Sequence, residues 1–178
     1  MYENNAGLGL ETPTATTTAT TPADIQALAE IKVRLQSQLK GSASWFFAIA
    51  ALSLVNSILM MAEANWHFFF GLGITDVVAA LAHPLGSAGI VAALVVNVFI
   101  AGIVVLFGVF ARKGQKWAFI VGMVLYAMDA LLVLLFRDYL AVLVHGYALW
   151  AISRGIKAIE PLRKIEQATL ATTPTPIG

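Results

Sequence analysis

The sequence predicts an all-α integral membrane protein, a four-helix bundle with an outer re-entrant or interfacial helix and a cytoplasmic amphipathic helix. Three observations predict this fold class. Apolar residues make up 59% of the 178 residues and charged residues only 12%, whereas soluble proteins average about 45–50% and about 25%. Four apolar segments are long enough to cross a bilayer. When these four are threaded through a membrane, the basic residues separate to one side.

The composition also excludes several classes of function. The formal net charge of +1 gives no basic field, so nucleic acid is not an expected partner. The absence of cysteine excludes disulfides, thiolate metal sites and thiol catalysis. The chain has no phosphate loop, dinucleotide fingerprint, paired-histidine zinc helix or nucleophile elbow. We therefore predict a non-enzymatic protein with no catalytic, cofactor-binding or metal-binding residue.

The N-terminal part contains a tail and an amphipathic helix. Residues 1–23 are a Thr/Pro-rich tail that is too poor in apolar residues to order itself, so we predict it to be disordered. Thr21, Pro22 and Asp24 are the residues of a helix start. The segment 24–41 then carries an apolar stripe, and Gly41-Ser42 offers a hinge. This helix either lies on the membrane surface or docks a partner as a short coiled coil.

Residues 42–157 form the predicted membrane domain. Its four crossing segments are 44–62, 88–111, 117–136 and 139–153. Residues 117–153 are too long for one straight helix, which would measure about 55 Å. The charged pair Arg137-Asp138 marks the turn of a tight helical hairpin.

The segment 67–83 is apolar but short, with Gly71 and Gly73 near its start, Asp76 inside it and His83-Pro84 at its end. If it does not cross, ten of the eleven basic residues share one side, as the positive-inside rule requires. We therefore predict a re-entrant or interfacial segment on the outer face, with both termini cytoplasmic. The ten residues are Lys32, Arg34, Lys40, Arg112, Lys113, Lys116, Arg154, Lys157, Arg163 and Lys164.

The C-terminal residues 158–178 are predicted to be a basic interfacial segment followed by a disordered tail. Ile156 and Ile159 share a face with basic residues beside them, a pattern that favours contact with anionic lipid headgroups.

Four polar residues fall within the predicted crossing segments, one on each helix: Asn56, Asn97, Asp129 and His145. Counted from the outer helix ends, all four lie roughly 10–14 Å below the outer surface. An aspartate at this depth costs on the order of 3 kcal/mol, so it must face the bundle and find a partner. His145 lies at the matching level of the adjacent helix, and Ser53, Ser57 and Tyr126 are close enough in sequence to extend the network.

Two interpretations of this polar layer remain open. Buried polar side chains often only hold transmembrane helices together. An ionisable pair inside a membrane is equally a candidate for proton, ion or ligand handling. A metal or haem site at His67, Asp76 and His83 would need a convergence of these residues that the sequence does not indicate.

Residues 71–76, residues 125–131 and Arg154-Gly155 carry a resemblance to a group of small bacterial multi-pass inner-membrane proteins without an assigned activity. The resemblance covers about residues 44–157. It implies a location in the bacterial inner (plasma) membrane and carries over no activity or site residue.

The sequence therefore predicts a small membrane scaffold or accessory subunit that acts by helix packing. The alternative is a small transporter or channel for a proton, ion or small ligand that uses the Asp129–His145 layer. The expected partners are the lipid bilayer and either another membrane protein or a second copy of the chain.

Overall fold

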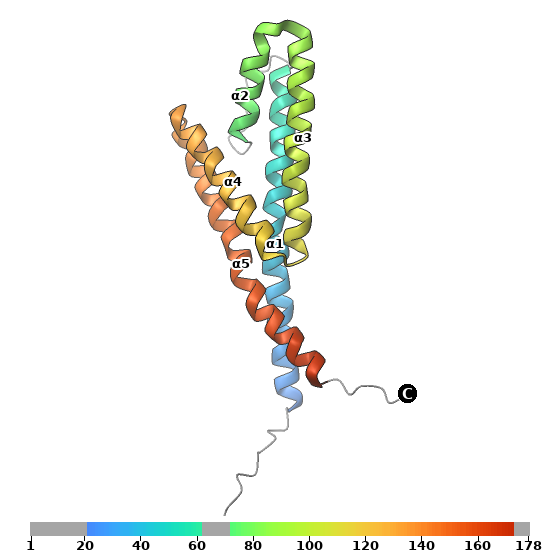
Figure 1. Ribbon diagram of the computed structural model, residues 1–178. Helices are drawn as coiled ribbons and strands as arrows, with labels where there is room; N and C mark the ends of the chain where they lie inside the picture. Colours follow the sequence, from blue (N-terminus) through green and yellow to red (C-terminus); the bar gives the residue numbers. More distant parts are fainter. Residues whose placement is uncertain (1–20, 62–71, 173–178) are drawn as a thin grey trace, which may run out of the picture.

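The computed structural model describes residues 21–61 and 72–172, and this part of the chain is helical throughout apart from short turns. Its elements are α1 (Pro22–Met61), α2 (Gly73–Ala82), the 3-10 helix η1 (His83–Leu85), α3 (Gly86–Arg112), α4 (Lys116–Leu135) and α5 (Tyr139–Thr172). The predicted all-α class is confirmed. Figure 1 shows α1 and α3 packed along one another, with the α4–α5 pair crossing them at an angle.

Helix α1 begins as predicted but does not break where predicted. The Thr21 hydroxyl and backbone N–H both donate to the Asp24 carboxylate, at 2.6 and 2.9 Å. These bonds lower the pKa of Asp24. The hinge expected at Gly41-Ser42 is wrong, because α1 continues through it to Met61. Leu39, Ala43 and Phe46 are all buried in one core cluster, so packing on both sides of Gly41 outweighs the helix cost of about 1 kcal/mol for a glycine.

Helices α2 and α3 form a hairpin closed by η1. Figure 1 shows that α2 starts partway along the length of the bundle and rises to the turn, from which α3 runs back past it. The predicted segment 67–83 thus corresponds to α2 and η1 from Gly73 onwards. Its earlier residues, His67 and Gly71 among them, lie outside the described part of the chain, as do residues 1–20 and 173–178. Of the predicted disordered tail 1–23, Pro22 and Ala23 belong to α1.

Helices α4 and α5 are joined at the predicted Arg137-Asp138 turn, where Arg137 has a positive φ of 59°. The end predicted for the last helix at residue 153 is wrong, since α5 continues through Pro161 to Thr172. Ala158, Ile159 and Leu162 are buried in the same core cluster as Leu39 of α1. This contact with the extended first half of α1 explains why the helix continues beyond residue 153.

An exposed ion pair links α4 to the extension of α5. Lys116 Nζ lies 2.7 Å from Glu160 Oε1. The hydrogen bond and charge of Lys116 lower the pKa of Glu160. The pair therefore exists above that lowered pKa and is lost as the pH falls through it. Both side chains are solvent-exposed, so the pair orients the helices more than it stabilises them.

Three helical stretches of the described residues are long and apolar enough to cross a membrane. They are Pro22–Leu59, Gly73–Arg112, which joins α2, η1 and α3, and Lys116–Leu135. The segment 139–153, expected as the fourth crossing helix, lies within α5 and does not meet the same measure of length and composition.

Glycines allow the close crossing of α1, α4 and α5. A Cβ atom added at Gly122 would lie 2.5 Å from the Phe46 ring. One added at Gly155 would lie 2.6 Å from the Phe119 ring and 2.7 Å from Ser42 Cβ. Phe46 and Phe119 are themselves fully buried with ring centroids 6.1 Å apart. The two rings occupy the space that side chains at residues 122 and 155 would otherwise fill.

We expect Gly155→Ala to lower the free energy of unfolding by about 1–3 kcal/mol, because the added methyl group overpacks a closed three-helix contact. Gly146→Ala on the same helix is the matched control. Nothing lies within 4 Å of a Cβ atom at residue 146, so alanine there leaves stability unchanged or raises it by up to about 1 kcal/mol. Thermal unfolding in detergent, followed by helical circular dichroism, measures both. Equal stability of the two variants would contradict the close crossing at Gly155.

Candidate functional site

All four polar residues predicted inside the bundle are buried. Asn56, Asn97, Asp129 and His145 expose between 1% and 7% of their surface. The structure brings three of them, Asn97, Asp129 and His145, around the first turn of α2. Asn56 is buried on α1, next to Ser57, which bonds Asn97.

Asp129 is the centre of this polar cluster. Its carboxylate accepts hydrogen bonds from the backbone N–H groups of Gly73 and Ile74, each at 2.8 Å. His145 Nε2 lies 3.0 Å from the same carboxylate. The contact between Asp129 and His145 that the helical hairpin predicted is therefore present. The carboxylate therefore connects three helices: it belongs to α4 and contacts the start of α2 and His145 of α5.

The bonds to Asp129 complete the N-terminus of α2. An α-helix leaves its first backbone N–H groups without partners inside the helix. Here Leu72 occupies the capping position and its own side chain makes no capping bond. The Leu72 N–H donates to Ser53 Oγ of α1 at 2.7 Å, and the Thr75 N–H donates to the Leu72 carbonyl. Together with the bonds to Asp129, every N–H from Leu72 to Thr75 has an acceptor.

Gly73 permits this approach. A Cβ atom added at residue 73 would lie 2.3 Å from Val133 Cγ2 and 3.7 Å from Asp129 Oδ1. Any side chain here would push the first turn of α2 away from α4. The glycine thus allows Asp129 to reach two successive backbone N–H groups.

The hydrogen bonds orient the His145 ring. His145 Nδ1 is 2.7 Å from the Ala141 carbonyl oxygen, which can only accept, so Nδ1 carries a hydrogen. Nε2 then faces the Asp129 carboxylate at 3.0 Å. The imidazole is therefore held at both ring nitrogens, by its own helix and by α4.

Asn97 of α3 bonds the same turn of α2 from the other side. Its Nδ2 donates to Ser57 Oγ at 2.9 Å and to the Thr75 carbonyl at 3.4 Å. Its Oδ1 is buried without a hydrogen-bond partner among the described residues. Asn97 therefore connects α1, α2 and α3 through its amide nitrogen.

Tyr126 does not extend the network in the way the sequence suggested. Its ring stacks on the His145 ring with centroids 4.5 Å apart and an interplanar angle of 16°. Its buried hydroxyl has no hydrogen-bond partner within residues 21–61 and 72–172. Tyr126 thus contacts the imidazole by ring stacking and not through a hydrogen bond of its hydroxyl.

Sequence reasoning missed the role of Gly73, Ile74 and Thr75. It identified Asp129 and a short outer helix separately, without joining them. A signal was available, because Leu72 cannot cap the helix that starts at Gly73. An apolar helix start without a capping residue requires an acceptor from elsewhere, and Asp129 is an isolated acid on a neighbouring apolar segment.

An apolar cavity of about 430 Å³ lies next to the cluster, between α1, α3 and α4. Asp129 and Tyr126 are its only lining residues with polar side chains. The remaining walls come from side chains such as Ile49, Ile100, Val104 and Phe107, and from Leu72 and Ile74 at the start of α2. The cavity suits an apolar group, since few polar atoms reach its surface.

The described residues contain no group of three or more His, Asp or Glu side chains that could hold a metal ion. His67, which the metal or haem interpretation required, lies outside the described part of the chain. Asp76 and His83 alone do not make such a site.

A comparison with known protein families, with curated proteins and with solved structures finds no match. The function is therefore argued from the geometry of the site.

Removal of the carboxylate should be costly. Asp129→Leu leaves two backbone N–H groups and the imidazole without an acceptor, so we expect a loss of about 3–5 kcal/mol in unfolding free energy. Asp129→Asn retains one oxygen acceptor and should cost clearly less. Unfolding in detergent measures both variants.

A double-mutant cycle with His145→Leu isolates the pair. For two contacting residues the cycle should give a coupling above roughly 0.5 kcal/mol. A coupling of zero, or equal costs for Asp129→Asn and Asp129→Leu, would contradict the arrangement.

Proposed function

We propose that this chain is a multi-pass membrane protein in which α1, α3, α4 and α5 cross the bilayer and α2 is a re-entrant helix. The distribution of side chains supports this proposal. Large apolar residues such as Phe99, Leu131 and Leu143 are 70%, 63% and 71% exposed, while Asp129 and His145 are 7% and 1% exposed. Such a surface is unfavourable in water and favourable in lipid.

The connection between α4 and α5 supports a fourth crossing. Only three residues, from Phe136 to Asp138, separate the two helices, and α5 packs back along α4. If α4 crosses the membrane, α5 must return through it. The outward residues Leu140 and Leu143 of α5 are exposed in the same way as those of α4.

The basic residues support the orientation. Ten of the eleven lie on the first half of α1, around the α3–α4 turn or on α5 from Arg154 onwards, and Arg137 lies at the opposite end. Those three regions occupy one end of the bundle (Figure 1). By the positive-inside rule this end is cytoplasmic, with both termini. Together with the resemblance of the sequence, this favours the bacterial inner membrane.

Within that membrane we propose a non-enzymatic scaffold or accessory subunit that acts by helix packing. The observation that carries this is the use of the Asp129 carboxylate, whose three hydrogen bonds all hold protein groups in place. Apart from Asp129 and Tyr126, the adjacent cavity is lined by apolar side chains and Gly122, a lining that suits packing more than the passage of ions. The polar layer therefore serves to fix α2 inside the bundle and leaves the apolar outer faces for a membrane partner or a second copy.

One observation favours the alternative, a small transporter for a proton or small ligand. The cavity reaches Asp129, whose carboxylate lies 3.0 Å from His145 Nε2, so an ionisable side chain and its partner border an open space.

Cysteine labelling tests the threading, because the chain has no native cysteine. In intact cells, cysteines at Lys40, Gly114 and Ala168 should be protected from an impermeant thiol reagent, and a cysteine at Ser87 should react. Labelling at residue 114 without labelling at residue 40 would mean that α2 and η1 belong to a crossing segment.

Flux in vesicles separates the two functions. We expect reconstituted wild-type chain and Asp129→Asn to give the same proton and cation flux as protein-free vesicles, because the Asp129 bonds are structural. A flux that the wild-type chain supports and a folded Asp129→Asn variant abolishes would overturn the scaffold proposal in favour of the transporter.

A further inference from the structure

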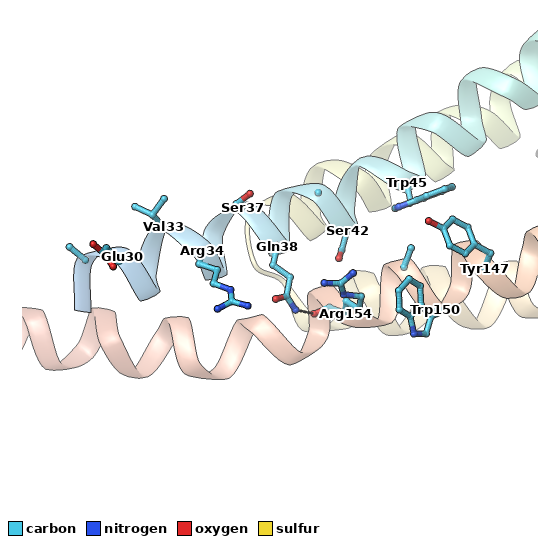
Figure 2. Close-up of a pocket in the computed structure, with 13 residues that line it drawn as sticks. Glu30, Val33, Arg34, Ser37, Gln38, Ser42, Trp45, Tyr147, Trp150 and Arg154 are labelled. Carbon is cyan, nitrogen blue, oxygen red and sulfur yellow. Dashed lines mark hydrogen bonds between the residues drawn. The ribbon is translucent and has the colours of Figure 1, made fainter. Parts of the chain in front are cut away.

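A second, larger groove lies between the first half of α1 and the middle of α5, near the cytoplasmic end of the bundle. Its volume is about 930 Å³. Figure 2 shows Arg34 extending from α1 towards α5 and Arg154 extending from α5 towards α1, with Gln38 between them. The Gln38 amide donates to the Arg154 carbonyl at 2.7 Å, which fastens the two walls together.

The positive charges of Arg34 and Arg154 are available to an anionic ligand. Neither forms an ion pair with a residue of the described chain. The Arg154 guanidinium lies 5.2 Å above the Trp150 ring, which orients it without neutralising it. Glu30 lines the groove one helical turn before Arg34, on the side away from the aromatic residues. Two guanidinium groups and one carboxylate leave the groove with a net positive charge.

The groove changes character along its length. Towards the membrane interior its walls are Trp45, Tyr147 and Trp150. The centroid of the Tyr147 ring lies 5.4 Å from that of Trp45 and 5.8 Å from that of Trp150. Beyond Tyr147 the same face of α5 continues with the exposed side chains of Leu143 and Leu140. A basic end, an aromatic middle and an apolar continuation are thus arranged in this order.

We propose that this groove binds an anionic phospholipid of the surrounding leaflet. The phosphate group would lie between Arg34 and Arg154, whose planar donors match phosphate oxygens. The glycerol region would lie against the aromatic side chains, which favour the membrane interface. One acyl chain would follow Leu143 and Leu140. Basic pockets between helices at the cytoplasmic side are suited to such headgroups.

The proposal rests on the membrane insertion proposed above. It goes beyond that function, because it assigns one lipid class to one site. The bound lipid would join α1 to α5 at the level where the two helices leave the membrane, and so would make assembly depend on lipid composition.

The test uses the purified full chain in a neutral detergent, with lipid binding followed by native mass spectrometry. The probes are phosphatidylglycerol, phosphatidylcholine with the same acyl chains, and inorganic phosphate. We expect the wild-type chain to bind phosphatidylglycerol about tenfold or more tightly than phosphatidylcholine, because two bases contact the anionic headgroup. The double variant Arg34→Gln with Arg154→Gln should lose this preference.

Lys32→Gln with Lys157→Gln is the matched control. It also removes two positive charges, one from α1 and one from α5, but neither lysine lines the groove. It should keep the preference within about twofold, because the screened surface charges contribute little. If the double glutamine variant fails to fold, Arg34→Lys with Arg154→Lys replaces it. The lysines keep the charge and lose the planar donors, so binding should weaken severalfold.

Equal lipid preference in the arginine variants and the wild-type chain would overturn the site. Equal binding of the two lipids would also overturn it. So would inorganic phosphate binding as tightly as phosphatidylglycerol, since the site would then recognise a free phosphate and not a lipid. These outcomes differ from failure of the membrane proposal, in which an alkaline carbonate wash would release the wild-type chain from cell membranes.

Discussion

The architecture depends on one constraint, the need to provide acceptors for the backbone N–H groups at the start of a helix inside the bundle. Helix α2 begins with Leu72 in the capping position, where the leucine side chain makes no capping hydrogen bond. The Asp129 carboxylate of α4 accepts the Gly73 and Ile74 N–H groups, and His145 Nε2 of α5 lies 3.0 Å from that carboxylate. Unsatisfied backbone groups in an apolar surrounding cost several kcal/mol each, so the position of α2 depends on these two side chains.

The other polar residues of the bundle serve the same turn of α2. Ser53 of α1 accepts the Leu72 N–H, and Asn97 of α3 donates to the Thr75 carbonyl. Each of the four long helices therefore contributes at least one polar group to the cluster. This arrangement explains why polar residues on segments far apart in sequence lie at one level, and it ties the packing of α4 and α5 to that of α1 and α3.

Much of this could be predicted from the sequence, because strong physical signals marked it. Hydropathy predicted the helical class and a short apolar segment before residue 84, which the structure forms as α2. The Arg137-Asp138 turn predicted that Asp129 and His145 would meet. The hinge at Gly41-Ser42 in α1 and the end of the last helix at residue 153 were predicted wrongly. Both came from local sequence features, whereas burial of Leu39 and Ile159 in a shared core continues both helices. The cap on α2 was missed because it joins Gly73 to Asp129 across 56 residues, and no local pattern specifies such a contact.

The most direct measurement of the central constraint is amide hydrogen exchange at Gly73 and Ile74, followed by nuclear magnetic resonance in lipid nanodiscs. Asp138→Asn is the control, since Asp138 caps α5 by accepting the Ala141 N–H at 3.0 Å. The account predicts that Asp129→Leu speeds exchange at Gly73 and Ile74, whereas Asp138→Asn leaves both protected. Unchanged protection of Gly73 and Ile74 in a folded Asp129→Leu chain would contradict it, because the two N–H groups would then have acceptors other than Asp129.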